Sequence, residues 1–308
     1  MSTAAVGPVP LRLRLRAALA LLRERARHYY ELCKPRVVML ITFTAIVGMF
    51  LATPGMVPLD VLLLGSLGIT LMAASAAAIN QLLDRHVDAR MARTCGRPLV
   101  TGTLTVAESL AFAAALGTLG FAVLVLWINA LTAWLTLATL VGYAGVYTLY
   151  LKRATPQNIV IGGAAGAAPP VLGWAAVTGT VDPHALLLFL IIFVWTPPHF
   201  WALAIDRHKE YASAGIPMLP VTHGLEFTRL QVLLYTVLLL AVSVLPFVFG
   251  MSGWVYFAGA LALGGVFVGY AVRLRFAPTP GLPMRTFGYS IVYLIGIFSL
   301  LLIDHYLR

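Results

Sequence analysis

Nine long apolar segments, most of them joined by short connections, make up most of this chain of 308 residues. Each could cross the roughly 30 Å hydrocarbon core of a bilayer as an α-helix, in which every backbone polar group is bonded within its own segment. Charged residues make up only 10% of the chain, against about 25% in soluble proteins, so most of its outer surface must face lipid. We therefore predict an all-α, polytopic membrane bundle of about nine transmembrane helices. The segments span about 36–53, 60–83, 106–127, 130–151, 158–178, 185–205, 227–249, 252–272 and 286–304.

The positions of lysine and arginine predict how the bundle is oriented. With the N-terminus inside, 20 of the 21 Lys and Arg residues fall on the inner side, and the terminal Arg308 is the exception. Basic residues are enriched in the cytoplasmic loops of membrane proteins. The pattern therefore predicts an N-in/C-out bundle. Its two long, charged inner loops, 84–105 and 206–226, indicate that the chemistry takes place on the cytoplasmic face.

The chain divides into a basic N-terminal arm, residues 1–33, and one membrane domain, residues 34–308. The arm carries six arginines and no acid before Glu24. It has two interpretations: an arm that lies on an anionic membrane surface, which we favour, or an organellar transit peptide.

The formal net charge of +10 does not indicate binding to nucleic acid, because the basic residues lie between apolar runs rather than on a soluble face. Cys33 and Cys95 are the only cysteines. Both fall on the predicted cytoplasmic side, where thiols stay reduced, so we expect no disulfide.

A polar stripe closes the second apolar segment. Asn80, Asp84 and Asp88 follow at four-residue steps, and each step turns an α-helix by about 400°, so the three share one face. Carboxylates with a neutral amide suit Mg²⁺, which takes oxygen ligands and usually keeps substrate phosphates in its shell. The alternative is an ordinary solvated helix end with Arg85 and Arg90 as ion partners. The spacing alone leaves both interpretations open.

A second charged segment follows the sixth apolar run. Asp206 and Glu210 are again four residues apart on an expected helix, and His199 lies seven residues before Asp206, close to the same face. Two acidic sites on one side of the membrane would form a cradle for divalent metal ions and a diphosphate. The alternative is a local ion-pair pattern, which Asp206 and Lys209 would satisfy.

Basic residues beside both acidic segments suit the oxygens of a diphosphate. Individually, each also serves the positive-inside topology, and their coincidence with two acidic motifs is what favours binding. They are Arg93, Arg97, Lys152 and Arg153.

Four stretches of the chain carry a family resemblance. They are NQLLDRHVDARMARTCGRPLVTG, LKRATPQNIVIGGAAGAAPPVLGWAAVTG, FVWTPPHFWALAI and YASAGIPMLPVTHG. The first resembles a motif shared by the UbiA-type intramembrane prenyltransferases, and the TPQNIVIGGAAGA and TPPHFWALA blocks are similar to the branch of that family that modifies haem. The resemblance is dense from Lys34 to Gly224, and the helix count extends it to the end.

The resemblance implies an enzyme that transfers the farnesyl group of farnesyl diphosphate to a vinyl group of haem B, with addition of water. The product would be haem O for haem–copper terminal oxidases. The implied cofactor is Mg²⁺, whereas haem B is a substrate. Asn80, Asp84 and Asp88 would bind magnesium diphosphate, and the second acidic segment would complete a metal-ligand set of Asp84, Asp88, Asp206 and Glu210. The remaining substrate-binding residues would be Arg93, Arg97, Lys152, Asn158, His199 and Tyr211.

The second acidic segment departs from the family pattern. Family members commonly carry two adjacent acids before the tyrosine, whereas this chain has Lys209-Glu210 before Tyr211, with Asp206 one turn earlier. Either Asp206 replaces the missing carboxylate or the second site carries less charge.

His199 is the candidate for contact with haem. Imidazole is a common axial ligand of haem iron, and an ionisable side chain within a membrane span marks a functional site. The alternative is a histidine that only hydrogen-bonds inside the bundle.

We expect a multi-pass protein of the bacterial inner membrane, in preference to the mitochondrial inner membrane, with its active site on the cytoplasmic side. Its expected partners are farnesyl diphosphate, haem B and lipid, with contact to a haem A synthase or an oxidase assembly. One alternative is a prenyltransferase for a quinone or chlorophyll precursor. The other is a polytopic transporter with helices broken at Pro169-Pro170 and Pro197-Pro198. Acids at one membrane face and the lack of a clear inverted repeat disfavour the transporter.

Overall fold

The computed structural model describes residues 11–308, with the backbone alone at several positions near the start of its first helix, and every regular element in this range is helical. In chain order the elements are α1 (Leu11–Leu32), α2 (Pro35–Leu51), the π-helix η1 (Val61–Gly65), α3 (Ser66–Asp88), α4 (Pro98–Thr101), α5 (Val106–Trp127), α6 (Ala130–Val141), the π-helix η2 (Gly142–Leu151), α7 (Lys152–Ala154), α8 (Asn158–Ala167), α9 (Pro169–Thr178), α10 (Pro183–Asp206), α11 (His208–Ser213), α12 (Leu219–Thr222), α13 (Gly224–Val248), α14 (Trp254–Phe276) and α15 (Leu282–Leu307).

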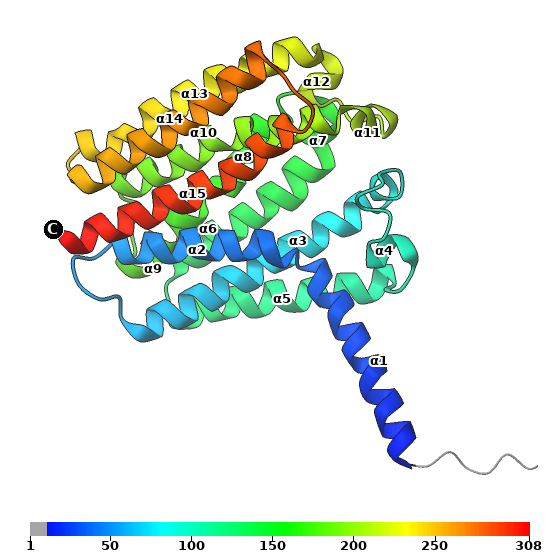
Figure 1. Cartoon of the computed structure of the whole chain (residues 1–308). Coiled ribbons are helices and arrows are strands. Elements are labelled where there is room, and N and C mark those ends of the chain that lie inside the picture. The colour runs from blue at the N-terminus through cyan, green and yellow to red at the C-terminus, as the bar shows by residue number, and fades with distance from the viewer. Residues whose placement is uncertain (1–10) are drawn as a thin grey trace, which may run out of the picture.

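The predicted bundle of membrane helices is confirmed (Figure 1). Within residues 11–308, eight helical stretches are individually long and apolar enough to cross a bilayer. The remaining predicted segment, about 36–53, corresponds to α2. Its 17 residues are long enough to cross a bilayer only together with the end of α1, and the two helices are bent by 56° relative to each other. Each of the nine apolar segments therefore corresponds to one helix or to two consecutive helical pieces.

The two proline pairs behave differently. Pro169 and Pro170 lie in the first turn of α9 and separate it from α8. Backbone N–H groups in a first turn have no partner within the helix, so proline costs no hydrogen bond there. Pro197 and Pro198 lie inside α10, which continues through them to Asp206. The break that the transporter alternative would place in this second helix is therefore not formed.

Helices α2 and α9 cross unusually closely, and two glycines make this possible. A Cβ atom on Gly48 would come within 2.2 Å of the carbonyl oxygen of Pro170, and one on Gly173 within 1.9 Å of the carbonyl oxygen of Ala45. Any larger side chain at either position would force the helices apart. Small residues at helix crossings are a common feature of membrane bundles.

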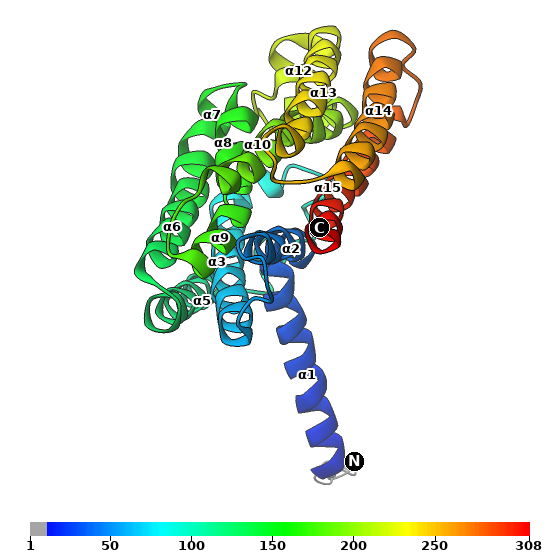
Figure 2. The same ribbon diagram turned by 90° about the vertical axis from the view of Figure 1, so that its left-hand side faces the viewer.

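The short helices α4, α7, α11 and α12 gather at one end of the bundle, and the C-terminus lies at the other (Figure 1). The view turned by 90° has α13 and α14 on one side and α5 and α6 on the other (Figure 2). Both long charged loops therefore emerge at the same end, as the spacing of the spans predicts.

The described part of the basic arm is the helix α1, which projects from the bundle (Figure 1). Its last turns are docked: Leu32 is fully buried, the rings of Tyr29 and Phe112 are 4.8 Å apart, and Arg25 forms an ion pair with Glu108 of α5. The arm before residue 11 lies outside the described residues.

Candidate active site

The first acidic motif occupies the last three turns of α3. Asn80, Asp84 and Asp88 are only 3%, 3% and 5% exposed, because they face the interior of the bundle along one stripe. The alternative of an ordinary solvated helix end is therefore wrong. Arg85, its expected ion partner, instead donates to the backbone oxygen of Leu82 at 2.9 Å.

Each carboxylate of this stripe is paired with a basic residue from another part of the chain. The Lys152 ammonium lies 2.7 Å from Oδ2 of Asp84, and the Arg97 guanidinium forms an ion pair with Oδ2 of Asp88. Buried charges need such partners, since an isolated carboxylate would lose its hydration without compensation. The fold therefore brings together four of the predicted residues.

Asn80 links the stripe to two further elements. Its amide nitrogen donates to Asp84 Oδ2 at 3.1 Å and to Thr148 Oγ1 at 2.9 Å, while its oxygen accepts from the ammonium of Lys34. With both its amide groups engaged, the Asn80 side chain has a fixed orientation.

The π-helix η2 positions Thr148 and Lys152. Thr148 Oγ1 donates to the backbone oxygen of Tyr143, five residues earlier, at 2.8 Å. Its oxygen therefore remains free to accept from Asn80. Lys152 follows directly after η2 and reaches Asp84. Short π-helical stretches are rare and are frequent at functional sites.

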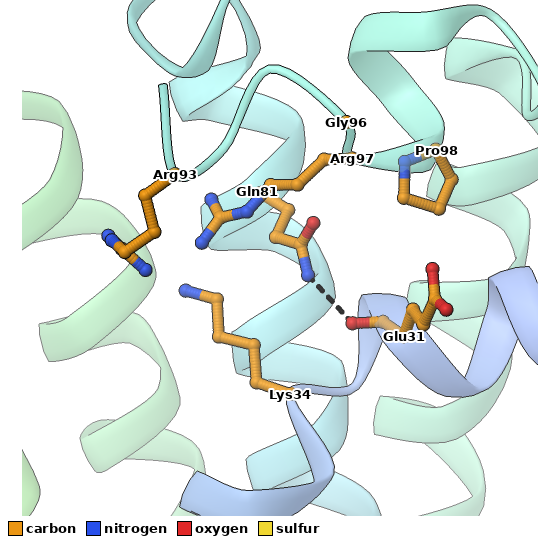
Figure 3. Close-up of a pocket in the computed structure, with 7 residues that line it drawn as sticks. All are labelled: Glu31, Lys34, Gln81, Arg93, Gly96, Arg97 and Pro98. Atoms are coloured by element: carbon orange, nitrogen blue, oxygen red, sulfur yellow. Dashed lines mark hydrogen bonds between the residues drawn. The ribbon is translucent and has the colours of Figure 1, made fainter. Parts of the chain in front are cut away.

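An open pocket of about 370 Å³ lies beside the stripe, at the end of the bundle that carries the charged loops. Figure 3 shows the charged ends of Lys34, Arg93 and Arg97 pointing toward a common space. The rest of the lining is Glu31, Gln81, Gly96 and Pro98. Three cations around one opening suit an anionic group with several oxygens.

Lys34 enters this pocket from a strained backbone conformation. It is the one described residue other than glycine with a positive φ, at φ 49° and ψ 61°. Pro35 disfavours a helical conformation at the preceding residue, so the chain breaks between α1 and α2 at this point.

The second acidic segment is not a continuous helix, so the prediction that Asp206 and Glu210 share one helix is wrong. Helix α10 ends at Asp206 and α11 begins at His208. Both acids contact the residue between them: Arg207 Nε lies 3.3 Å from Asp206 Oδ2, and its Nη1 lies 2.7 Å from Glu210 Oε1. The partner of Asp206 is therefore Arg207 and not Lys209, which the local ion-pair alternative had proposed.

A buried apolar cluster joins the two charged segments. Met91, from the loop after α3, packs in it with Ile205 of α10 and Tyr211 of α11. Burial in this cluster raises the pKa of the Tyr211 phenol. Tyr211 therefore packs between the two segments.

Asn158 is fully buried at the start of α8. Its nitrogen donates to the backbone oxygen of Thr155 at 2.8 Å, and its Oδ1 has no hydrogen-bond partner. Asp84 Oδ1 is likewise buried without a partner. Unpaired buried oxygens are costly, so these two acceptors need a partner from outside the described chain, either water or a ligand.

The family of the chain follows from comparison with known proteins. The model of the UbiA prenyltransferase family matches residues 41–298. The chain belongs to the UbiA prenyltransferase family.

Curated relatives of this UbiA prenyltransferase are named protoheme IX farnesyltransferase. That of Methylococcus capsulatus is 62% identical over 281 residues, which is 91% of this chain and 94% of the relative. That of Alkalilimnicola ehrlichii is 64% identical over 281 residues, with 91% and 93% covered. That of Legionella pneumophila is 62% identical over 280 residues, with 91% and 95% covered.

Solved structures share the fold at low identity. One, of a digeranylgeranylglyceryl phosphate synthase, has a TM-score of 0.77 at 18% identity and covers 92% of this chain and 100% of that one. A UbiA homologue from Aeropyrum pernix has a TM-score of 0.72 at 19% identity, with 88% and 98% covered. Another from Archaeoglobus fulgidus, bound to GPP and Mg²⁺, has a TM-score of 0.60 at 20% identity, with 89% and 99% covered.

The oxygen atoms of the acidic stripe in this UbiA prenyltransferase fit Mg²⁺ only if the substrate supplies further ligands. Across residues 11–308, no three His, Cys, Asp or Glu side chains gather closely enough to hold an ion together. Magnesium, however, is usually held by one or two carboxylates together with substrate phosphates and water. The unpartnered Oδ1 of Asp84 is such a donor. The stripe therefore fits an ion that arrives with a phosphate substrate.

Four residues that line the pocket or contact the stripe were not predicted from the sequence: Glu31, Lys34, Gln81 and Thr148. Gln81 donates to the backbone oxygens of Glu31 and Leu32 at 2.9 and 3.0 Å, which fixes the end of α1 against α3. The Lys34-Pro35 pair was the one readable signal, because it marks a helix break. Nothing in the sequence pattern points to Thr148.

Proposed function

We propose that this prenyltransferase transfers the farnesyl group of farnesyl diphosphate to a vinyl group of haem B and, with addition of water, yields haem O. The observation that carries the proposal is the identity of 62–64%, over nine-tenths of the chain, with proteins named protoheme IX farnesyltransferase. The pocket beside the acidic stripe supports it, because its three cations suit a diphosphate.

The chemistry requires a leaving group to be stabilised and a cation to be protected from water. The bond between C1 of the farnesyl group and the diphosphate oxygen breaks, and the electron pair leaves with the diphosphate. Lys34, Arg93 and Arg97 neutralise the charge that develops on it. The terminal vinyl carbon of haem B then bonds to C1, and the resulting cation beside the porphyrin takes a water molecule, which loses a proton.

Asp84 and Asp88 would hold Mg²⁺ through their carboxylate oxygens, with Asn80 and Asn158 beside them. The ion, when bound, supplies positive charge that stabilises the departing diphosphate. Lys152 and Arg97 hold the two carboxylates in place, and Arg97 also lines the pocket in which the diphosphate would bind. Asp84 Oδ1 has no hydrogen-bond partner, so binding an ion would cost it no hydrogen bond.

We place the second acidic site at Asp206 and Glu210, and this placement explains the departure at Lys209. Arg207 joins the two carboxylates, so Asp206 supplies the acid that the family pattern has next to Glu210. One oxygen of Glu210 is buried without a partner, which leaves it available to a second ion. Tyr211, anchored in the apolar cluster, holds this segment against the first motif.

The chain is a multi-pass membrane protein. We propose the N-in/C-out orientation in a bacterial inner membrane, with the pocket on the cytoplasmic side, because 20 of the 21 basic residues lie on that side. The substrates farnesyl diphosphate and haem B would reach it from the cytoplasm and the bilayer. Contact with a haem A synthase or an oxidase assembly would pass the product on.

A competition between acceptors tests the proposal. Purified enzyme in lipid nanodiscs is given farnesyl diphosphate, Mg²⁺ and equal amounts of haem B and an aromatic quinone precursor. We expect only the haem to be prenylated, and the Asp84→Asn variant to prenylate neither. Prenylation of the quinone precursor with unmodified haem would favour the alternative enzyme.

A further inference from the structure

His199 is held in one orientation by three aromatic neighbours. Its ring stacks on Trp195 at 4.2 Å and 20° and on Phe287 at 4.4 Å and 26°, while Phe200 meets its edge at 4.9 Å. The residue is 7% exposed. The two stacked rings cover both faces of the imidazole, so only its edge, with the two nitrogens, is left for polar contacts.

One of the two nitrogens is bound to Ser290 of α15. The His199 Nδ1 atom lies 2.6 Å from Ser290 Oγ, and that hydroxyl in turn lies 2.6 Å from the backbone oxygen of Phe287. Two oxygens at this separation need a proton between them. A serine has only one hydroxyl proton. Ser290 therefore donates to Phe287, and it must accept from His199.

This hydrogen-bond chain assigns the tautomer of His199. The proton is on Nδ1, and Nε2 carries the free lone pair. Nε2 makes no hydrogen bond within the described part of the chain. It is also not one of the fully buried polar atoms that lack a partner, so it is accessible from outside the protein. Trp195 also donates from its indole nitrogen to the Ser290 backbone oxygen at 2.7 Å, which fixes α10 against α15 at this point.

The accessible lone pair of Nε2 distinguishes His199 from a histidine that only hydrogen-bonds inside the bundle. The arrangement is instead that of a metal-binding histidine. Such a residue donates its other ring N–H to an oxygen, which fixes the ring and raises the basicity of the free nitrogen.

We propose that His199 Nε2 is the axial ligand of the iron of haem B and that Ser290 is the positioning residue that presents it. The inference rests on the proposed function, since it assumes haem B as the acceptor. Coordination of the iron would hold the porphyrin at the inner half of α10, and the helix ends at the second acidic segment, seven residues after His199. A vinyl edge would then be held at a constant distance from the charged end of the bundle.

Resonance Raman spectroscopy of ferrous haem B bound to the full-length enzyme, without farnesyl diphosphate, tests the ligation. We expect an iron–histidine stretching band that is lost in His199→Gly and restored by added imidazole. His184→Ala is the matched control, because His184 lies on the same helix near its opposite end and pairs with Asp182. Its spectrum should be unchanged. Persistence of the band in His199→Gly, or its absence from the wild-type complex, would overturn the proposal.

A second pair of variants tests Ser290 without touching the ligand. Ser290→Ala removes the acceptor of the Nδ1 proton, so haem affinity should fall by about 10–100-fold and the stretching band should shift. Ser290→Thr keeps the hydroxyl, so its haem affinity and its stretching band should both be close to those of the wild type. Unchanged affinity and spectrum in Ser290→Ala would refute the positioning role.

The ligation and the proposed function fail separately. Wild-type enzyme that converts haem B with farnesyl diphosphate, while His199→Gly keeps the band, refutes only the ligation. Wild-type enzyme that binds haem with the band but never prenylates it refutes the proposed function and leaves a haem-binding site.

Discussion

The Lys152 ammonium and Oδ2 of Asp84 lie 2.7 Å apart in the interior of the bundle, although the residues are 68 positions apart in the sequence. The pair neutralises a buried carboxylate and leaves its second oxygen without a partner. The site therefore combines a fixed charge with one donor atom ready for a ligand.

Replacing either acid of the stripe should stop the reaction without unfolding the protein. Asp84→Asn and Asp88→Asn keep the size of the side chain and one oxygen that accepts from the basic partner, but they remove the charge. We expect product formation to fall by at least about 100-fold, as for removal of a key electrostatic group. Haem O formation at ordinary Mg²⁺ is the measurement.

The control for these variants is Glu226→Gln. Glu226 is an exposed acid that pairs with Arg229 and Arg275 near the start of α13. Its loss should leave the rate near that of the wild type. Near-normal turnover in Asp84→Asn or Asp88→Asn would refute the assignment of the stripe.

Thr148 should act only by orienting Asn80. Thr148→Val removes the hydroxyl that accepts from Asn80 Nδ2, and we expect a fall of about 10-fold in kcat/KM, the lower end of the range for residues that position a ligand. Thr148→Ser keeps the oxygen and should retain most of the activity. Equal rates for Val and Ser at this position would show that the hydrogen bond is unimportant.

The predicted orientation is open to cysteine labelling. In a background with Cys33 and Cys95 replaced by serine, Lys209→Cys should react with an impermeant thiol reagent only after the membrane is opened. Thr180→Cys, in the seam between α9 and α10, should react from outside in intact cells. Labelling of position 209 in intact cells would contradict the N-in/C-out topology.

Asp304 stabilises the bundle far from the charged end. It is buried at the end of α15 and accepts from the backbone nitrogens of Gly253 and Tyr256, so it caps the start of α14. Asp304→Ala leaves these donors unpaired, and we expect a loss of about 1–2 kcal/mol in the free energy of unfolding in mixed micelles. Farnesyl transfer by the folded enzyme should persist. Unchanged stability would mean that the cap is replaced by water.

The sequence was sufficient for the nine apolar segments and for the three-residue stripe, because hydrophobic length and helical spacing are local properties. It also singled out Lys152 and Arg97, but as residues that bind a diphosphate and not as ion partners of the stripe, for which it named Arg85 and Arg90. It did not predict which carboxylate each would contact. That depends on how α3 meets η2 and the loop after it, and this packing is not encoded in local spacing.

The break at Arg207 shows why the second acidic segment was harder to predict. No glycine or proline marks the end of α10, so a continuous helix was the natural expectation. The chain turns because α11 is held by Tyr211 in the apolar cluster around Met91. Thr148 was not predicted because its contact with Asn80 depends on the π-helical register of η2, and a π-helix has no clear sequence signature.

Mass analysis of the haem is the most direct test of the central claim. Purified wild-type enzyme is incubated with haem B, farnesyl diphosphate and Mg²⁺ in water enriched in heavy oxygen. We predict a haem heavier by one farnesyl group and one hydroxyl group, with the heavy isotope in that hydroxyl. Recovery of unmodified haem B from active, folded enzyme would contradict the account.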